Sequence, residues 1–185
     1  MATPADIDYL LPKHHGEWTV EDVLALPEDN GNRIELVDGA LLVTPAPTSG
    51  HQRLLHRLQL RMDAAVPPGT ELLPGVNIRL GERRLLIPDF VVVTCPGVDT
   101  VYFDAADVLL AAEIESPSTK VTDRVLKREL YADCGVPYYL LVNPAKVAEV
   151  VLFELASEGY KEIARSQDGK LELIRPFAAN LDLNP

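Results

Sequence analysis

Two carboxylates stand in apolar surroundings in this sequence. Asp89 lies within the apolar run 85–93, and Glu113 lies within the run 109–114. Both runs are typical of buried strands. An ionised carboxylate in such surroundings is costly unless a cation, a metal or hydrogen-bond donors meet it. Glu115 follows Glu113 by two residues, so strand alternation predicts that both side chains share one face.

These acidic residues predict a site for a hard cation. Asp89 and Glu113 come from separate predicted strands, and we expect them to meet at one edge of the sheet together with Glu115. Three like charges at one place repel one another unless a cation is bound. Mg²⁺ prefers one or two carboxylates, completed by waters and phosphate oxygens. A metal site that acts on a phosphate is therefore the chemistry to search for.

Basic residues occur in two groups. The first, which follows Glu113, consists of Lys120, Arg124, Lys127 and Arg128. The second consists of Arg53, Arg57 and Arg61, spaced as i, i+4 and i+8 on a predicted helix. Each group is a candidate basic edge on an acidic protein, and an ordinary solvated helix face explains the second group equally well.

Composition limits how nucleic acid can be held. The chain has 185 residues, 47% of them apolar, and a net charge of -11. This charge argues against binding through bulk electrostatics, so any contact with phosphates must be local or assisted by a metal. We expect one domain over residues 18–185 after an extension of residues 1–17. Neither a secretory signal nor a membrane-spanning run is evident, which predicts a cytoplasmic protein with no membrane association.

The expected elements alternate between strands and helices. Thr19 is a helix N-cap, and that short helix is expected to end at Leu26, before Pro27. Asp38-Gly39 is typical of a hairpin turn. The other expected helices cover about 48–65 and 122–135, and the strands cover 33–37, 40–43, 71–80, 85–94, 108–115, 138–142, 149–155, 160–165 and 171–174. This order predicts an α/β fold with a mixed central sheet flanked by helices and a C-terminal antiparallel meander. The glycines occur singly at turns, which argues against a nucleotide-binding fold with a phosphate loop.

Several spaced motifs resemble a known family. They are Glu35 to Gly39, Pro45-Ala46-Pro47, His51, Pro88-Asp89, Glu113-Ile114-Glu115, Ser116 to Thr119, Asp123, Lys127, Tyr131 and Gly135 to Tyr138. Together they resemble the Uma-two family of restriction-endonuclease-like proteins, which belongs to the PD-(D/E)XK nuclease superfamily. The resemblance covers roughly residues 18–155. It implies a restriction-endonuclease-like fold and a Mg²⁺- or Mn²⁺-dependent endonuclease that hydrolyses DNA.

The resemblance also implies roles for individual residues. Asp89, Glu113 and the main-chain carbonyl of Ile114 would hold the metal. Glu115 stands where the superfamily has its lysine, and a carboxylate cannot donate a proton to a developing phosphorane. Lys127 on the following helix is expected to supply the positive charge that the superfamily's lysine provides. Its alternative is an exposed i, i+4 pair with Asp123.

Five further residues complete the candidate site. Glu35 matches an acidic residue that superfamily members contribute early in the chain, or it is a surface residue of the hairpin. His51 contacts the metal-bound water or the substrate, or it lies on a helix surface. Lys120 and Arg124 are expected to bind substrate. Tyr131 either orients Lys127 or packs.

Three alternatives to an active nuclease remain open. The first is a nuclease-derived module that binds nucleic acid without cleaving it, which is consistent with the displaced lysine. The second is an assembly role through the edge strands of the meander. The third is a metal hydrolase for a small phosphate ester. We expect a homodimer without an organic cofactor in the nuclease case, and metal-dependent cleavage distinguishes the nuclease from the binding module.

Overall fold

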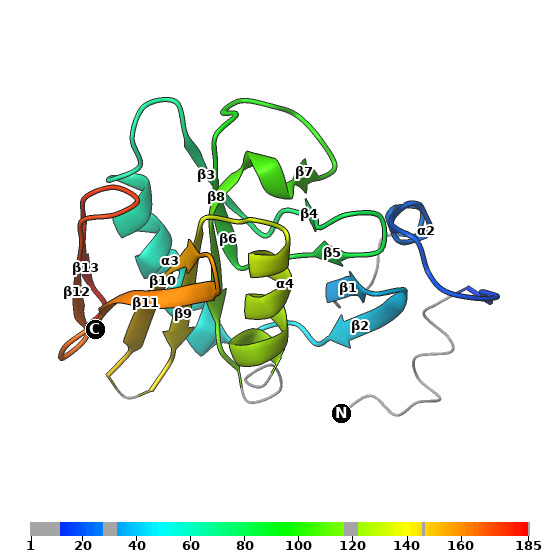
Figure 1. The fold of residues 1–185 in the computed structure, drawn as a ribbon. Coiled ribbons are helices and arrows are strands. Elements are labelled where there is room, and N and C mark those ends of the chain that lie inside the picture. The colour runs from blue at the N-terminus through cyan, green and yellow to red at the C-terminus, as the bar shows by residue number, and fades with distance from the viewer. Residues whose placement is uncertain (1–11, 28–32, 117–121, 146, 185) are drawn as a thin grey trace.

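The computed structural model describes residues 12–27, 33–116, 122–145 and 147–184, with the side chains of Thr122 and Asp123 left aside. Its elements, in chain order, are α2 (Val20–Leu24), β1 (Arg33–Val37), β2 (Ala40–Thr44), α3 (Ser49–Asp63), β3 (Glu71–Pro74), β4 (Ile78–Arg79), β5 (Leu85–Leu86), β6 (Phe90–Val93), β7 (Phe103–Asp104), η1 (Ala105–Asp107), β8 (Val108–Ile114), η2 (Thr122–Lys127), α4 (Arg128–Asp133), β9 (Tyr138–Asn143), β10 (Glu149–Ala156), β11 (Gly159–Arg165), β12 (Lys170–Leu173) and β13 (Ala179–Asp182). Figure 1 shows their arrangement. The predicted mixed α/β fold is confirmed.

The main sheet has six strands in the order β11-β10-β9-β8-β6-β3. β8 and β9 are parallel, whereas the other neighbours are antiparallel. A parallel pair requires a crossover connection, and η2 and α4 lie within it. The crossover brings Lys127, at the end of η2, back to the sheet edge where β8 ends.

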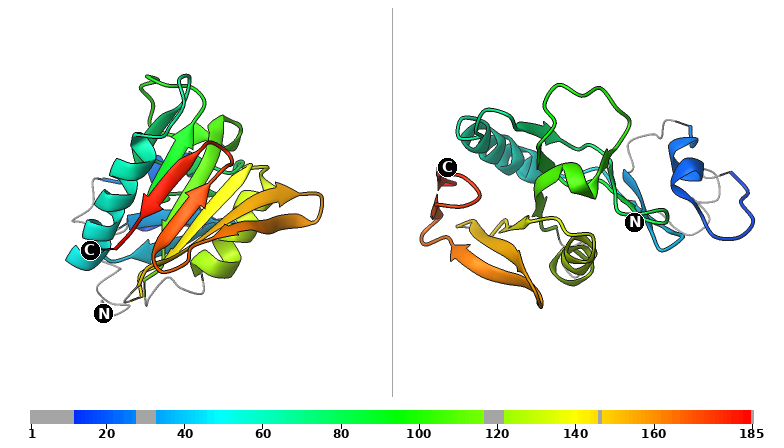
Figure 2. Two further views of the ribbon diagram at one scale, coloured as in Figure 1. Left: turned by 90° about the vertical axis from the view of Figure 1, so that its left-hand side faces the viewer. Right: turned by 45° about the horizontal axis from the view of Figure 1, so that its top comes forward.

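Helices cover both faces of the main sheet (Figure 2). On one face, Leu58 and Met62 of α3 are fully buried in a cluster with Phe90 and Val92 of β6. The other face carries α4, which contributes Leu130 and Tyr131 to a second cluster. Strand alternation explains the division, because neighbouring residues of β6 point to opposite faces. The apolar stripe predicted for α3 is therefore confirmed.

A second sheet has five short strands in the order β2-β1-β5-β4-β7. The hairpin of β1 and β2 turns at Asp38 and Gly39, whose φ angles are 49° and 84°. Positive φ at both residues is what a type I′ turn requires, so this prediction is confirmed. The helix before the hairpin, α2, has the expected cap at Thr19 but ends at Leu24 rather than Leu26.

Two of the expected strands each cross from one sheet to the other, and here the prediction was wrong. The expected strands 71–80 and 85–94 are each divided: β3 and β6 belong to the main sheet, while β4 and β5 belong to the second. Gly75, at a φ of 60°, lies in the first break, and Pro88, which has no amide donor for a strand ladder, lies in the second. Asp89 therefore lies where the chain passes from β5 to β6, not inside a strand.

The C-terminal segment also differs from the expected meander. β10 and β11 form antiparallel neighbours within the main sheet, but β12 pairs with β13, which was not predicted. Leu171, Leu173 and Leu181 of this two-stranded ribbon are buried in the cluster that contains α3. The ribbon covers one face of the main sheet because its alternating apolar side chains have a core to enter there.

Candidate functional site

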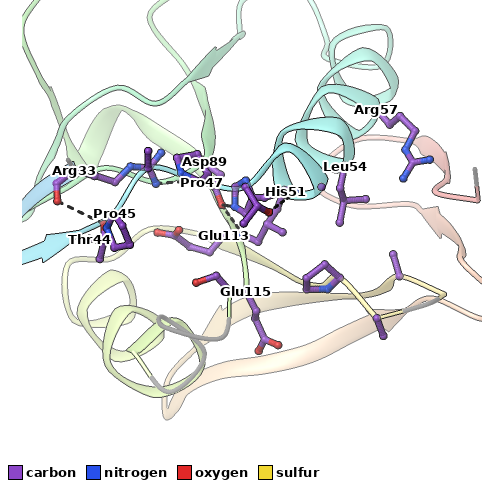
Figure 3. Close-up of a pocket in the computed structure, with 18 of the residues that line it drawn as sticks. Arg33, Thr44, Pro45, Pro47, His51, Leu54, Arg57, Asp89, Glu113 and Glu115 are labelled. Carbon is purple, nitrogen blue, oxygen red and sulfur yellow. Dashed lines mark hydrogen bonds and ion pairs between the residues drawn. The ribbon is translucent and has the colours of Figure 1, made fainter. Parts of the chain in front are cut away.

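Asp89 and Glu113 lie beside each other at the end of two paired strands. The register of β6 and β8 pairs Phe90 with Ala112, and the Asp89 amide donates to the Ala112 carbonyl at 3.0 Å. The Ile114 amide in turn donates to Asp89 Oδ2 at 2.7 Å. Figure 3 shows both carboxylates in one pocket. The meeting of these residues at a sheet edge is confirmed.

Lys127 joins Glu113 to a third carboxylate. Its Nζ lies 3.0 Å from Glu113 Oε1 and 2.9 Å from Glu35 Oε1. The Lys127 side chain is only 4% exposed, so it does not lie on an exposed helix face as the alternative required. The side chain of Asp123 lies outside the described residues. Like Lys127, Glu35 is buried, and its Oε1 also accepts from the Ile87 amide at 2.7 Å. The surface alternative for Glu35 is therefore wrong as well.

Two cations face the other side of the site at Asp89. His51 Nε2 lies 3.2 Å from Asp89 Oδ2, and Arg33 Nη1 lies 3.3 Å from Asp89 Oδ1. Arg33 also donates to the Ile87 carbonyl at 3.1 Å. The Thr48 hydroxyl caps α3 by accepting from the His51 amide at 3.3 Å, which fixes the first turn that carries His51. His51 thus faces the carboxylates instead of lying on an open helix surface.

The charges of the site shift the pKa values of its members. Burial raises the pKa of Asp89, but the hydrogen bond with His51 and the charges of His51 and Arg33 outweigh burial, so this pKa is lowered. The same hydrogen bond raises the pKa of His51. For Arg33, burial lowers the pKa, while the charges of Asp89, Glu113 and Glu35 raise it, with a net increase. Acidic and basic side chains therefore lie next to one another in the site, and each shifts the pKa values of its neighbours.

Tyr131 contacts the site from α4. Its hydroxyl lies 3.3 Å from Glu113 Oε1, and its side chain is fully buried. Burial, followed by the charges of Glu113 and Glu35, raises the pKa of Tyr131 well above its ordinary value. The hydroxyl therefore remains a hydrogen-bond donor, and Tyr131 both packs and orients the carboxylate that holds Lys127.

Glu115 lines the same pocket as Asp89 and Glu113, but its carboxylate is directed to Arg124 instead of toward theirs. It follows the last residue of β8, and its carboxylate binds Arg124 through Nε and, at 3.0 Å, through Nη2. In Figure 3 the Glu115 side chain points away from Asp89. Strand alternation ceases to apply where the strand ends, which explains the error.

The site opens into a pocket of about 580 Å³. Charged residues form one part of its wall, namely Arg33, Glu35, His51, Arg57, Asp89, Glu113, Glu115 and Lys127. Apolar residues form another part, among them Pro45, Pro47, Leu54, Ala148 and Leu183. Arg124 lines an adjoining pocket together with Arg128 and Arg165, and Lys120 lies outside the described residues.

The structure adds two pocket residues that had no assigned role. Arg33 lies two residues before Glu35 on β1, so strand alternation was the available signal that both face the same side. Arg57 lies on the pocket face of α3, unlike Arg53 and Arg61, which are exposed. For Arg57 the sequence offered only its helical spacing, which does not distinguish the pocket from solvent.

The donor set fits a hard divalent cation completed by other ligands. Asp89, Glu113 and the Ile114 carbonyl supply oxygen atoms, which Mg²⁺ and Mn²⁺ prefer. Within the described ranges, Glu35 Oε2 is buried without a hydrogen-bond partner, so a further oxygen is available at the site. Among the described residues, no group of three or more His, Cys, Asp or Glu side chains is placed so that it could hold a metal ion by itself. Water and substrate oxygens would complete the coordination.

Within the described part of the chain, no helix has the length and apolar character needed to cross a membrane.

Comparisons with known proteins agree with the fold. Comparison with curated protein sequences gave no match. A crystal structure described as that of "a putative nuclease" from Anabaena variabilis is similar, with a TM-score of 0.67 and 19% identity over 86% of this chain and 89% of that chain. It shares the fold. The sequence model of the family described as "Putative restriction endonuclease" matches residues 20–184, and the chain therefore belongs to this family, Uma2.

Proposed function

We propose that this chain is a divalent-metal-dependent nuclease that hydrolyses phosphodiester bonds of DNA. The observation that carries the proposal is a buried lysine between two carboxylates: Lys127 Nζ contacts Glu35 and Glu113 at 2.9 and 3.0 Å, next to Asp89. A buried cluster of this kind at a pocket is typical of a site that changes or binds charged groups. Membership of a family described as a restriction endonuclease supports the same reading.

Asp89, Glu113 and the carbonyl of Ile114 are the proposed ligands of Mg²⁺ or Mn²⁺. When bound there, the cation would offset the charge of the attacked phosphate and lower the pKa of a bound water. The chain's own residues prepare the site for it. The lowered pKa of Asp89 keeps its carboxylate ionised, which is the form that binds a cation.

Lys127 is the proposed electrostatic partner of the reacting phosphate. Its ammonium group is fixed by Glu35 and Glu113 rather than moving on a flexible stem. Preorganised donors of this kind stabilise charge that develops in a transition state, because they need not reorient during the reaction. The lysine comes from η2, so it can take this role although Glu115 stands at the usual position of the superfamily's lysine.

Four further residues are proposed to contact the substrate. His51 and Arg33 add positive charge on the Asp89 side of the pocket. Arg124 lines the adjoining pocket, where it would contact a more distant part of the strand, and Lys120 is proposed for the same role from its place in the sequence. Since cutting both strands of a duplex needs two sites, we also propose a homodimer, which sedimentation would test.

A cleavage assay tests the proposal. Labelled single-stranded and duplex DNA would be incubated with the protein in Mg²⁺, in Mn²⁺ and in EDTA, and compared with Asp89→Asn, Glu113→Gln and Lys127→Ala. Glu129→Gln, a change at an exposed residue of α4, is the matched control. We expect metal-dependent cleavage by the parent and the control, and its loss in the three site variants.

Two outcomes would contradict the nuclease proposal. Cleavage by Asp89→Asn at the parental rate would show that the activity arises elsewhere. Metal-dependent DNA binding without cleavage over long incubation would instead favour a nuclease-derived binding module. Circular dichroism of each variant would show whether a loss of cleavage reflects a loss of fold.

A further inference from the structure

Arg57 differs from the other arginines of α3. It faces the pocket that contains the carboxylates, as do Gly50, His51 and Leu54. Residues at such spacing lie on one face of a helix. Arg53 and Arg61, one turn to either side, are exposed. The same helix thus carries one arginine inside the pocket wall and two in solvent.

The Arg57 guanidinium contains a buried donor that is not paired with an acceptor. Its Nε is buried, and among the described residues it has no hydrogen-bond partner. Buried donors in proteins are nearly always paired with protein atoms, water or a ligand. A guanidinium at a pocket wall fits an anion whose oxygens can accept several N–H groups, and phosphate is such an anion.

Arg57 lies at a distance from the carboxylates that suits a second phosphate. It follows His51 by six residues, which corresponds to ~9 Å along a helix. Figure 3 shows Leu54 between the two residues, with Arg57 at the end of the row farthest from Asp89. A nucleic-acid strand carries a phosphate on each nucleotide, so a strand with one phosphate at Asp89 and Glu113 extends another toward Arg57.

We propose that Arg57 binds a phosphate of the substrate strand within two nucleotides of the phosphate that is cleaved. The proposal rests on the nucleic-acid substrate proposed above and adds a second contact point to it. Leu54, which lines the same pocket between His51 and Arg57 (Figure 3), offers an apolar surface for the intervening sugar and base. One strand thereby spans the pocket from the carboxylates to Arg57.

Binding measurements test this without requiring cleavage. The affinity of a fluorescent single-stranded DNA oligonucleotide would be measured in Ca²⁺ over a range of salt, for the parent, Arg57→Gln, Arg53→Gln and Arg61→Gln. We expect Arg57→Gln to weaken binding about tenfold and to reduce the slope of log K against log salt by ~0.7, the value for one lost phosphate contact on a single strand. The two exposed-arginine controls carry the same charge change and should stay within about twofold of the parent.

A second measurement locates the contact along the DNA strand. A series of oligonucleotides, each with one neutral methylphosphonate linkage, would be compared for binding to the parent and to Arg57→Gln. We expect one linkage near the cleavage position whose neutralisation weakens binding to the parent but not to Arg57→Gln. This arm stays informative if the variant folds poorly, because the position-dependent loss in the parent is itself required.

The outcomes separate this proposal from the nuclease proposal. Equal binding by Arg57→Gln and Arg61→Gln, or a uniform response to every methylphosphonate position, overturns the role of Arg57 even if DNA is cleaved. A selective loss at Arg57 supports that role even if no cleavage occurs, in which case it is the nuclease proposal that fails.

Discussion

Two groups of charged side chains meet where β8 ends. They differ in burial and in whether all their polar atoms have partners. The inner site consists of Arg33, Glu35, His51, Asp89, Glu113 and Lys127. The outer network consists of Glu115, Arg124, Glu149, Glu162 and Arg165, which line a neighbouring pocket of about 400 Å³. Glu113 and Glu115 are two residues apart in sequence, yet each belongs to a different group.

In the outer network each arginine is paired with a carboxylate, and Arg165 lies close to solvent. Arg165 contacts Glu149 through Nη1 and Glu162 through Nε at 2.8 Å, and its side chain is 47% exposed. Arg124 binds Glu115 with two nitrogens. The exposed pairs of Arg165 contribute about 0–1 kcal/mol each, because water solvates both partners when such a pair breaks. The Glu115 carboxylate that Arg124 binds is the exception, since its side chain is only 2% exposed.

The inner site is buried and incompletely paired. Among the described residues, Glu35 Oε2 and His51 Nδ1 are buried without hydrogen-bond partners. Buried charges are costly when they are not fully compensated. The difference indicates that the ion pairs of the outer network hold η2 and β11 in place. The inner site instead has polar atoms that are available to bind a ligand.

The largest expected effect is on stability, from removing the buried cation. Lys127→Met leaves Glu35 and Glu113 facing each other in the interior, so we expect the free energy of unfolding to fall by about 3–5 kcal/mol. Urea denaturation in EDTA would measure it. Arg165→Gln, which removes the central cation of the outer network, should cost no more than about 1 kcal/mol.

A double variant sharpens this comparison. Adding Glu35→Gln to Lys127→Met removes one of the two opposing charges, and we expect part of the lost stability to return. If the two single cation removals cost the same, or if the second change brings no recovery, the inner site does not carry the buried charge that its geometry indicates.

The next effect is on cleavage, and it separates the two neighbouring glutamates. Glu113→Gln removes a proposed metal ligand and the partner of Lys127, so we expect the single-turnover rate with Mg²⁺ to fall at least about 100-fold. Glu115→Gln weakens only the contact with Arg124, and we expect less than about a tenfold loss. Each variant carries the same chemical change. An equal loss in both would place Glu115 in the catalytic group after all.

Local patterns were sufficient to predict several elements. The turn at Asp38-Gly39, the Thr19 cap and the buried stripe of α3 follow from backbone preferences and helical spacing, which involve residues close in sequence. The resemblance named Asp89, Glu113 and Lys127, and the structure places them in one pocket. Their chemical roles remain proposals.

Features that depend on distant contacts were not predictable. An apolar run indicates burial but not the sheet to which a strand belongs, so the crossings at Gly75 and Pro88 and the pairing of β12 with β13 were missed. Likewise, nothing near Glu115 in the sequence shows whether its carboxylate points toward the other carboxylates or pairs with Arg124. Arg33 and Arg57 became site residues only through the folding of β1 and α3 around the same pocket.

The smallest of the expected effects is a difference in pH dependence between the two groups. The folded-state pKa of His51 is raised above 6.5 by Asp89, so its pair contributes stability that is fully present below about pH 6.5 and is lost as the pH rises through the folded-state value. The Asp89 pKa is lowered, so its contribution is lost only in acid. In the outer network, Arg165 lowers the pKa of Glu162, and that pair stays charged at neutral and alkaline pH.

Thermal unfolding in EDTA at about pH 6 and about pH 9 would test this difference. We expect the parent and Arg165→Gln to lose melting temperature between these two values by similar amounts, because the outer network does not titrate there. His51→Gln should show a smaller loss, since the titrating partner of Asp89 is gone. If His51→Gln kept the full parental pH dependence, the contact between His51 and Asp89 would be too weak to matter. The inner and outer groups would then differ in burial but not in how tightly their charges are coupled.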